Sequence, residues 1–559
     1  MKKQRIFSRS AAVLLALIVA LACLPAASAA EYNTANAVSL LFSDTSITAT
    51  GGSNTGYKIN GTKLTLSGAG TYILSGTCSN GSVKVEKGTT DVTLVLKGLS
   101  LTSTDTAPII CAKSSHVTIL AEAGSVNTLT DTAQNNDETH PENTNAENAV
   151  IKCKDGSQVT LGGSGTLNLV AKGKNGIKSG VTTESEGEAW LLIRDLKLNI
   201  DAAVNDGINA EQLLTIESGT ITVSAISDGV HCDLVMNIGA ADTEGPTITV
   251  TKCSEGLEAA NLNIFSGKIT VHAQDDCLNA ANSDLSRYAF TLNISGGTLL
   301  LDTTGGDGID SNGTLTISGG TTVVWTASTS DNQALDADGA ITVTGGTVLA
   351  AGGSAGMGMR LSAGQPYVSF GSAAMGGFGG GGRPNKGFGG QSSTGLLSSG
   401  SAFEIRDASG NTVYSGTAVY NASSIFFSSP SLTSGSNYTL SSGGNEVASA
   451  AAGTSATGSG DQQQPIPGGQ QPTPGGQQPI PGGQQPLPDD KESPPETQPS
   501  VSMDSGNTEK EDSAASPTDA SQTGNGDRAL WIAFGVLAVC TAIAILLLGL
   551  NLKKQRKSD

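Results

Sequence analysis

The residues best suited to chemistry are acidic and amide side chains that recur just before a buried aliphatic residue. Runs such as NDGINA at 205, SDGVHC at 227 and GDGIDS at 306 return every 21 to 31 residues. The position two residues before the aliphatic side chain holds Asn175, Asp206, Asp228, Glu255, Asp276, Asp307 and Gln333. If successive runs stack about 4.8 Å apart, neighbouring carboxylates repel by about 3 kcal/mol per pair. Such a row requires a counter-charge.

A second row follows one residue beyond the aliphatic side chain. It contains Lys178, Asn209, His231, Glu258, Asn279, Asp310 and Asp336. Two parallel rows of oxygen atoms with turn carbonyls between them suit calcium, which takes six to eight hard oxygen ligands, whereas zinc prefers His and Cys. The predicted calcium ligands are Asp206, Asp228, Glu255, Asp276 and Asp307 in the first row and Asn209, Glu258, Asn279, Asp310 and Asp336 in the second. The alternative is that Asp-Gly only forms tight turns and that the side chains satisfy backbone groups.

The segments between these runs predict the fold. LTIESGTITVSA and LNIFSGKITVHA alternate aliphatic residues with Thr, Ser and Asn, a period of two. No useful window shows a helical period, so we expect almost no helix. One repeat cannot bury a face by itself, but stacked repeats bury a continuous core. The sequence therefore predicts an all-β solenoid, a parallel β-helix, within residues 30–370, with coils from about Thr62 to Phe370.

Other segments of the ectodomain interrupt or follow this pattern. The acidic, Asn-rich stretch Asp131 to Glu147 predicts a loop, and residues 371–400, which include Gly376 to Gly390, a Gly-rich loop. Residues 401–451 predict a small β cap, with strand patterns from Phe403 to Leu440. The six cysteines at 78, 111, 153, 232, 253 and 277 lack paired metal spacing and suit either disulfides or buried thiols.

Strand alternation also predicts an outward apolar patch on the last coils. With Ile221 and Val223 inward, the later coils expose Leu300, Val323, Leu349 and Trp325. Large exposed apolar patches often mark interaction sites, and an indole can stack on a pyranose ring. The predicted substrate-binding residues are Trp325, Leu300, Val323, Asp302 and His272. The alternative is that the Gly-rich segment or the cap covers this patch.

The two ends predict export and anchoring. Residues 1–29 have the basic, apolar and small-residue parts of a signal peptide. Residues 529–552 are long and apolar enough to span a bilayer, and the basic residues 553–559 favour a cytoplasmic tail with the ectodomain outside. Residues 520–527 resemble a sortase signal but lack its Leu-Pro, which favours a single-pass membrane anchor over cell-wall attachment. Residues 452–528, rich in Pro, Gln, Gly and acidic residues, predict a disordered linker.

The net charge of −19 argues against nucleic acid as a partner. It suits cation binding, and we expect a monomer.

From about Leu64 to Leu440 the chain resembles the bacterial carbohydrate-binding domain-containing proteins. The motifs that carry the resemblance are AGTYILSGT, VTLVLKGLSLTS, NTLTD, the DGI repeats and SSIFFSSPSLTSGSNYTL at 423–440. The resemblance implies a right-handed parallel β-helix like that of pectate lyases. It also implies bound calcium and binding of pectic acid or cellulose-like polymers, without established catalysis.

Three functions remain open at this point. We favour a non-catalytic surface module that binds an extracellular polysaccharide with calcium. The second is a calcium-dependent polysaccharide lyase, in which a Lys or Arg abstracts the proton beside a uronate carboxylate. Candidate bases are Lys172, Lys174, Lys178, Arg194 and Arg360, but no arrangement of them is diagnostic, so no catalytic residue is predicted. The third is a structural or adhesive stalk.

Overall fold

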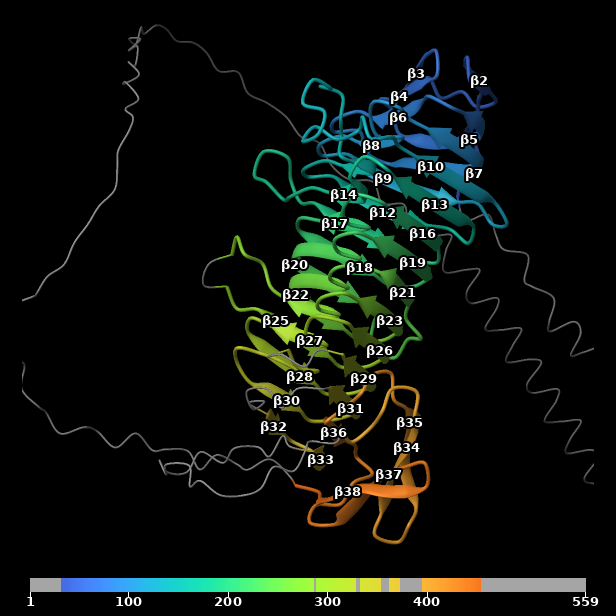
Figure 1. The fold of residues 1–559 in the computed structure, drawn as a ribbon. Coiled ribbons are helices and arrows are strands. Elements are labelled where there is room, and N and C mark those ends of the chain that lie inside the picture. Colours follow the sequence, from blue (N-terminus) through green and yellow to red (C-terminus); the bar gives the residue numbers. More distant parts are fainter. Residues whose placement is uncertain (1–31, 286–287, 328–331, 353–360, 372–394, 454–559) are drawn as a thin grey trace, which may run out of the picture. The chain divides into compact units, whose positions relative to one another are not determined.

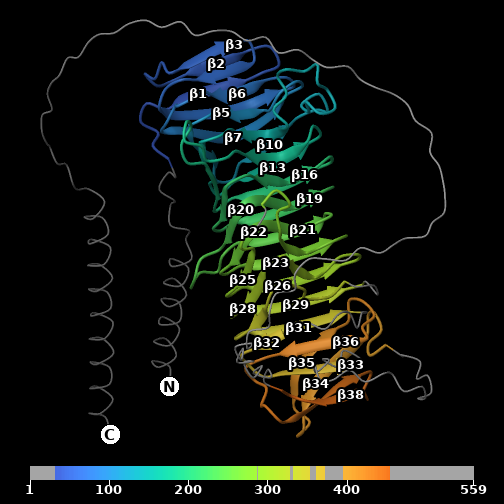
Figure 2. The ribbon, with the colours of Figure 1, turned by 90° about the vertical axis from the view of Figure 1, so that its left-hand side faces the viewer.

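The computed structural model describes residues 32–285, 288–327, 332–352, 361–371 and 395–453. Throughout these residues the regular structure is β, with no helix. The all-β prediction is therefore confirmed for this part of the chain. Figures 1 and 2 show the strands stacked in successive coils from the N-terminal hairpins to a small C-terminal sheet.

Each coil in the middle of the chain contains three strands. One coil has β11 (Ala149–Cys153), β12 (Gln158–Gly162) and β13 (Thr166–Ala171), and the next has β14 (Asn175–Ser179), β15 (Trp190–Ile193) and β16 (Lys197–Ala202). Each strand pairs in parallel with its counterpart in the next coil. Repetition of this pairing gives three parallel sheets, which is the arrangement of a β-helix.

The three sheets are named here by their strands. Sheet I contains β4 (Lys63–Leu66), β6 (Ser82–Val85), β8 (Ile109–Cys111), β11, β14, β17 (Ile208–Ala210), β24 (Leu278–Ala280) and β27 (Ile309–Ser311). Sheet II contains β9 (His116–Ala121), β12, β15, β18 (Leu213–Ile216), β25 (Thr291–Ile294), β28 (Thr314–Ile317), β30 (Ile341–Val343) and β32 (Leu361–Ala363). Sheet III contains β10 (Val126–Thr130), β13, β16, β19 (Thr220–Ala225), β21 (Thr247–Lys252), β23 (Lys268–Ala273), β26 (Thr298–Thr303), β29 (Thr321–Thr326) and β31 (Thr347–Gly352).

Four longer strands complete these sheets. β20 (Val230–Ile238) and β22 (Leu257–Ile264) run from sheet I into sheet II, and β5 (Gly70–Cys78) and β7 (Val92–Thr102) run from sheet II into sheet III. At the N-terminal end, β1 (Val38–Phe42) forms a hairpin with β2 (Ile47–Thr50), and β3 (Tyr57–Asn60) forms one with β4. These antiparallel pairs lie at the first coils.

The core follows the predicted alternation. In β19, Ile221 and Val223 are fully buried while Thr222 lies on the outer face. The aliphatic residue of each acidic run stacks on that of the next coil, in the order Ile177, Ile208, Val230, Leu257, Leu278 and Ile309. This ladder places the two polar rows in fixed register on either side of it.

A glycine separates the acidic residue from its aliphatic neighbour in most runs, although Cys277 takes this place after Asp276, and close packing between coils requires it. A Cβ at Gly229 would lie 2.7 Å from the carbonyl oxygen of Gly256 and 2.7 Å from Cγ1 of Val250. Neither neighbour can move without shifting a strand. The Gly therefore lets successive coils approach, and it brings the acidic residues of one coil near those of the next.

The C-terminal region differs in one respect from the predicted separate cap. β34 (Ala402–Asp407), β35 (Thr412–Thr417), β37 (Asn437–Ser442) and β38 (Asn445–Ala451) form a four-stranded antiparallel sheet. However, β36 (Ser424–Ser428) pairs antiparallel with β31 and with β33 (Tyr367–Gly371) of the solenoid. The strand connects the two cores, because its Phe426 is buried in the solenoid core while Ile425 and Phe427 are buried with the cap residues.

Residues 131–148 contain no strand, as expected, and the six cysteines at 78, 111, 153, 232, 253 and 277 are buried free thiols. The predicted signal peptide, the Gly376–Gly390 stretch, almost all of the predicted linker and the predicted span 529–552 lie outside the described residues. Within the described residues, the structure contains no helix of the length and hydrophobicity needed to cross a membrane.

Candidate functional site

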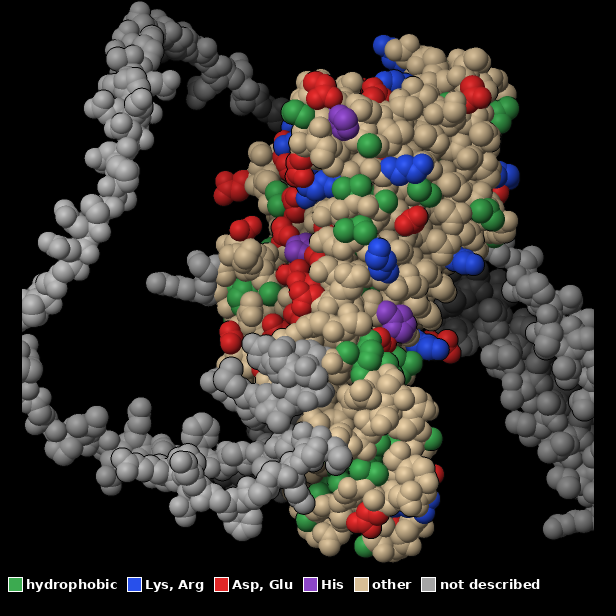
Figure 3. All heavy atoms as spheres, in the orientation of Figure 1, with side chains coloured by type: hydrophobic (Ala, Val, Ile, Leu, Met, Phe, Trp, Pro, Cys, Tyr) green, Lys and Arg blue, Asp and Glu red, His purple; other side chains and the backbone are tan. Residues whose placement is uncertain are grey.

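The two polar rows lie side by side where each coil enters sheet I. The second row has the predicted register, because Lys178 pairs with Asn209, Asn209 with His231, His231 with Glu258, Glu258 with Asn279, and Asn279 with Asp310. We call the two rows from Asp206 to Asp336 the carboxylate track. Figure 3 shows acidic side chains gathered along this edge of the solenoid.

The first row satisfies backbone groups in several coils. Asp206 is 4% exposed, and its Oδ1 accepts a hydrogen bond from the backbone N–H of Asp228 at 3.1 Å. Its Oδ2 accepts one from Asn209 Nδ2 at 2.7 Å. Oδ1 of Asp276 likewise accepts the N–H of Asp307 at 2.6 Å. The structural interpretation of the ladder therefore holds for these oxygens, and Asp206 has no oxygen left without a partner.

His231 is a cation within the track. Its Nδ1 lies 3.2 Å from Asp228 Oδ2 and 3.1 Å from Glu258 Oε2, and its Nε2 lies 2.9 Å from Asp233 Oδ1. Burial alone lowers the pKa of the imidazole, but hydrogen bonds to Asp228, Asp233 and Glu258 outweigh it and raise the pKa to about 12. An imidazolium therefore already supplies the counter-charge for Asp228 and Glu258.

Beyond His231 the track has acidic groups without a counter-charge. Burial, and then the charge of Glu258, raise the pKa of Glu255 to about 8. Burial and neighbouring carboxylates raise the pKa of Asp276 and that of Asp307 to about 7, even though backbone N–H groups oppose the shift. Burial and Asp336 also raise the pKa of Asp310. No ion pair joins these carboxylates to a basic side chain in the described part of the chain.

The strongest cluster lies on the last coils of sheet I. One oxygen each from Asp307, Asp310 and Asp336 lies within 4.8 Å of the others, and all three residues are partly buried. In the neighbouring coil, Asn279 is 8% exposed and donates through Nδ2 to Glu255 at 2.9 Å. Its Oδ1 is buried and accepts no hydrogen bond from any described residue. A buried acceptor among carboxylates lacks a positive partner, so these residues fit a hard cation.

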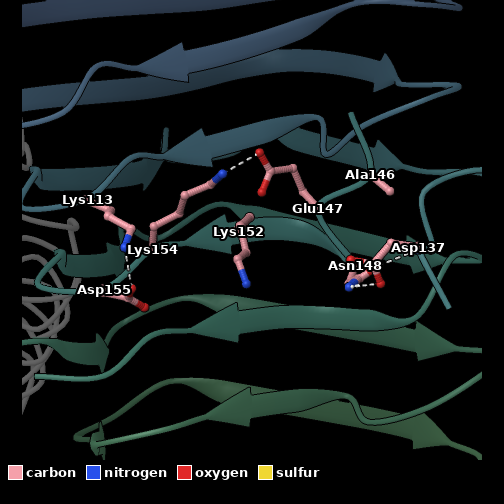
Figure 4. A pocket seen from close by; sticks show the side chains of 8 residues that line it. All are labelled: Lys113, Asp137, Ala146, Glu147, Asn148, Lys152, Lys154 and Asp155. Carbon is pink, nitrogen blue, oxygen red and sulfur yellow. Dashed lines mark hydrogen bonds and ion pairs between the residues drawn. The ribbon is translucent and has the colours of Figure 1, made fainter. Parts of the chain in front are cut away.

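The opposite end of the second row is basic. Lys152 pairs in register with Lys178 and lines a pocket of about 260 Å³ with Lys113, Asp137, Ala146, Glu147, Asn148, Lys154 and Asp155. Figure 4 shows Lys113 paired with Asp155, at 2.7 Å, and Lys154 paired with Glu147, at 2.6 Å. Lys152 has no such partner among the described residues. Burial and then Lys178 lower the pKa of its ammonium group.

The sequence interpretation missed Lys152 because its coil, AVIKC, has no acidic residue or glycine before the aliphatic side chain. The signal was nevertheless present, since Ile151 aligns with Ile177 and therefore places Lys152 beside Lys178.

The late-coil patch has the predicted register but not the predicted exposure. Leu300 pairs with Val323, Val323 with Leu349, and Asp302 with Trp325. Trp325 is 3% exposed and Leu349 is 1% exposed. The Trp325 ring packs edge-on against Phe403 of the cap, with ring centroids 6.0 Å apart. The exposed stacking surface predicted for Trp325 is therefore wrong, because the cap covers it.

The polar flank of this patch is also tied to the cap. His272 Nδ1 lies 2.6 Å from Asp302 Oδ2, and the Tyr420 hydroxyl donates to Asp302 Oδ1 at 3.1 Å. Leu300, at 40% exposed, stays accessible, while Val323 is partly buried and packs against the cap core. The structure thus brings the five predicted residues together, but these residues and the described part of the cap leave no broad sugar-stacking face.

Residues 60–356 match the family model of the carbohydrate-binding domain-containing proteins. The chain belongs to this family. A carbohydrate-binding domain-containing protein of Acetivibrio thermocellus is 32% identical over 123 residues, which cover 22% of this chain and 42% of that protein. The chain thus spans less than half the length of this relative. A solved structure of a polysaccharide lyase-like protein from C. thermocellum, a gadolinium derivative, has 22% identity and a TM-score of 0.29, and the match covers 58% of this chain and 96% of that one.

Proposed function

We propose that the chain is a non-catalytic, surface-tethered protein that binds an extracellular polysaccharide and holds calcium in its carboxylate track. Membership of the carbohydrate-binding domain-containing family supports binding of a polysaccharide. The calcium part of the proposal rests on the late-coil cluster, in which Asp307, Asp310 and Asp336 converge in the coils next to Asn279, whose Oδ1 has no hydrogen-bond partner among the described residues.

The residues that would hold calcium are those of the late coils. Carboxylate and amide oxygens are the ligands that calcium prefers, and its flexible coordination leaves positions for water or a ligand oxygen. Asp206, Asp228 and Glu258 are weaker candidates, because hydrogen bonds occupy both oxygens of Asp206, and the His231 imidazolium occupies one oxygen of Asp228 and one of Glu258.

An acidic polymer such as pectic acid suits this site. A chain with a net charge of −19 repels a polyanion unless cations lie between them. Calcium bound at the track can bridge carboxylates of the protein and of the uronate polymer. The unpaired Lys152 ammonium can form an ion pair with another uronate carboxylate. A cellulose-like neutral polymer would gain nothing from this bridge, so the track favours pectic acid.

The second candidate is a polysaccharide lyase, and Lys152 is the observation that favours it. A lysine with a lowered pKa can act as a general base. However, Lys152 stands five coils from Asn279 along the second row, which corresponds to about 24 Å at the spacing of parallel strands. A base must lie within about 3 Å of the proton it removes, so calcium at the late coils cannot acidify a proton beside Lys152. The separation supports binding over lysis.

The proposed location is the cell membrane, with the ectodomain outside. It rests on the signal sequence 1–29, the apolar segment 529–552 and the basic tail 553–559. Residues 452–528, whose composition is rich in Pro, Gln, Gly and acidic residues, would act as the spacer between the bound polymer and the membrane.

The test is retention of the full chain on immobilised polygalacturonate with calcium or with EDTA. We expect retention that depends on calcium and is lost when Asp310→Asn and Asp336→Asn are combined. Asp201→Asn is a matched control, since Asp201 is an exposed carboxylate on sheet III without an ion pair among the described residues. Equal retention of the wild type in EDTA and in calcium would exclude the calcium bridge. Unsaturated product, detected by absorbance, would favour the lyase.

A further inference from the structure

A second shallow groove lies on the outer face of sheet II, apart from the carboxylate track. It has a volume of about 330 Å³ and is lined by residues of β7, β9, β12 and β15 together with Asp91. His116, Gln158 and Trp190 form one outward row across three successive coils, because Gln158 pairs with both His116 and Trp190. Thr93, Thr118 and Thr160 form the adjacent outward row.

The groove combines one flat aromatic ring with polar side chains. Trp190 is partly exposed, and its indole contacts no other aromatic ring in the described residues. The Trp190 indole N–H and the exposed His116 ring make no hydrogen bond to a described residue. Gln158 donates through Nε2 to the Glu188 carbonyl at 3.3 Å, which leaves its Oε1 free to accept. The groove therefore presents a ring face beside unused donors and acceptors.

The backbone holds these side chains rigidly. Val92, Val117 and Leu191 alternate with the outward residues and are almost fully buried in the core. Gln158 and Trp190 stand on adjacent coils about 4.8 Å apart. A site on paired strands needs little reordering when a ligand binds, which favours affinity.

We propose that this groove is a subsite for a pyranose ring of a neutral polysaccharide. The C–H face of a pyranose can stack on the Trp190 indole, while its hydroxyl groups bond to Gln158, His116 and the threonines. Asp91 is the single carboxylate among the lining residues, and no lysine or arginine lines the groove. The lining thus suits hydroxyl groups rather than an anion.

This inference rests on the carbohydrate binding in the proposed function and adds a second site to it. The track binds acidic polymer through calcium, whereas the Trp190 groove requires no metal. The two faces therefore divide acidic and neutral polymers between them, and their binding can be measured separately.

The test is calorimetric titration of the full chain with cellohexaose, a neutral oligosaccharide, in EDTA. We expect binding that Trp190→Ala weakens by about tenfold and that Trp190→Phe largely preserves, since a second aromatic ring retains the stacking. Phe265→Ala is the control, because Phe265 is an exposed aromatic residue, at 38%, outside the groove. Trp190→Ala should still bind polygalacturonate in calcium. If Trp190→Ala fails to fold, Gln158→Ala tests the groove instead, and we expect it to lose less affinity for cellohexaose than Trp190→Ala would.

Three results would overturn the inference alone. The first is equal cellohexaose affinity of Trp190→Ala and the wild type. The second is wild-type chain that binds polygalacturonate in calcium but not cellohexaose, which would leave the proposed function intact. The third is a wild-type dimer that Trp190→Ala converts to a monomer, which would show that a second copy occupies the groove. If the wild type binds neither polymer, the proposed function and the subsite both fail.

Discussion

Removal of calcium should destabilise the chain more at pH 8 than at pH 5. Glu255, Asp276 and Asp307 have folded-state pKa values raised to about 8, 7 and 7 from ordinary values of 4.5, 3.8 and 3.8. Between about pH 4 and pH 8 the metal-free folded chain therefore binds more protons than the unfolded chain. The contribution of these groups to the free energy of unfolding is therefore complete below about pH 4 and is lost as the pH rises through their folded-state pKa values.

The size of this effect follows from the shifts. One pKa unit corresponds to about 1.4 kcal/mol, so the shift of Asp276 alone corresponds to at most about 4 kcal/mol. The contributions do not add, because the three carboxylates interact. Calcium at a hundred times its dissociation constant should restore about 2.7 kcal/mol by mass action, which corresponds to a Tm increase of roughly 5 °C for a large domain.

The assay is thermal unfolding of the full chain at pH 5 and pH 8, in EDTA and in millimolar calcium. We expect a small calcium effect at pH 5 and a larger one at pH 8. In EDTA, Glu255→Gln should raise the Tm at pH 8, because a neutral amide removes the repulsion. Glu217→Gln is the control, since Glu217 is exposed and outside the track. The reasoning is refuted if wild-type melting at pH 8 is identical in EDTA and calcium.

Three further predictions concern single side chains. His231→Gln should lower the free energy of unfolding by about 2 kcal/mol in urea titrations, because Asp228, Asp233 and Glu258 lose their imidazolium. Because the pKa of His231 is raised from 6.5 to about 12 in the folded chain, this contribution is complete below pH 6.5 and declines as the pH rises from 6.5 towards 12, so a difference between wild type and His231→Gln that stays constant across this range would contradict it. Trp325→Ala should cost about 3 to 5 kcal/mol of stability, measured by melting, without weakening polysaccharide retention; a stable variant with weaker retention would show that the cap leaves the indole accessible. Lys152→Met should reduce polygalacturonate retention while leaving the Tm unchanged or higher, whereas Lys97→Met, which removes an exposed partner of Glu122, should not change retention.

Much of the solenoid could be predicted from the sequence, because short stretches of neighbouring residues determine its strands and their register. A period of two assigns each residue to the core or the outer face, and repetition of the acidic run fixes which residues stack. The row from Lys178 to Asp310 and the inward positions of Ile221 and Val223 follow from these two facts.

Contacts between distant segments required the tertiary structure. Trp325 points outward from its coil, as its register dictates, but β36 and the cap cover it from about a hundred residues later in the chain. The positive charge of His231 depends on its contacts with Asp233 in its own coil and Glu258 in the next, which only the folded chain brings together. The groove around Trp190 needed three coils whose intervening loops have unequal lengths, so its row could not be read from a regular repeat. Alternation determines whether a side chain faces the core or the outside, but what covers or neutralises it depends on packing between distant residues.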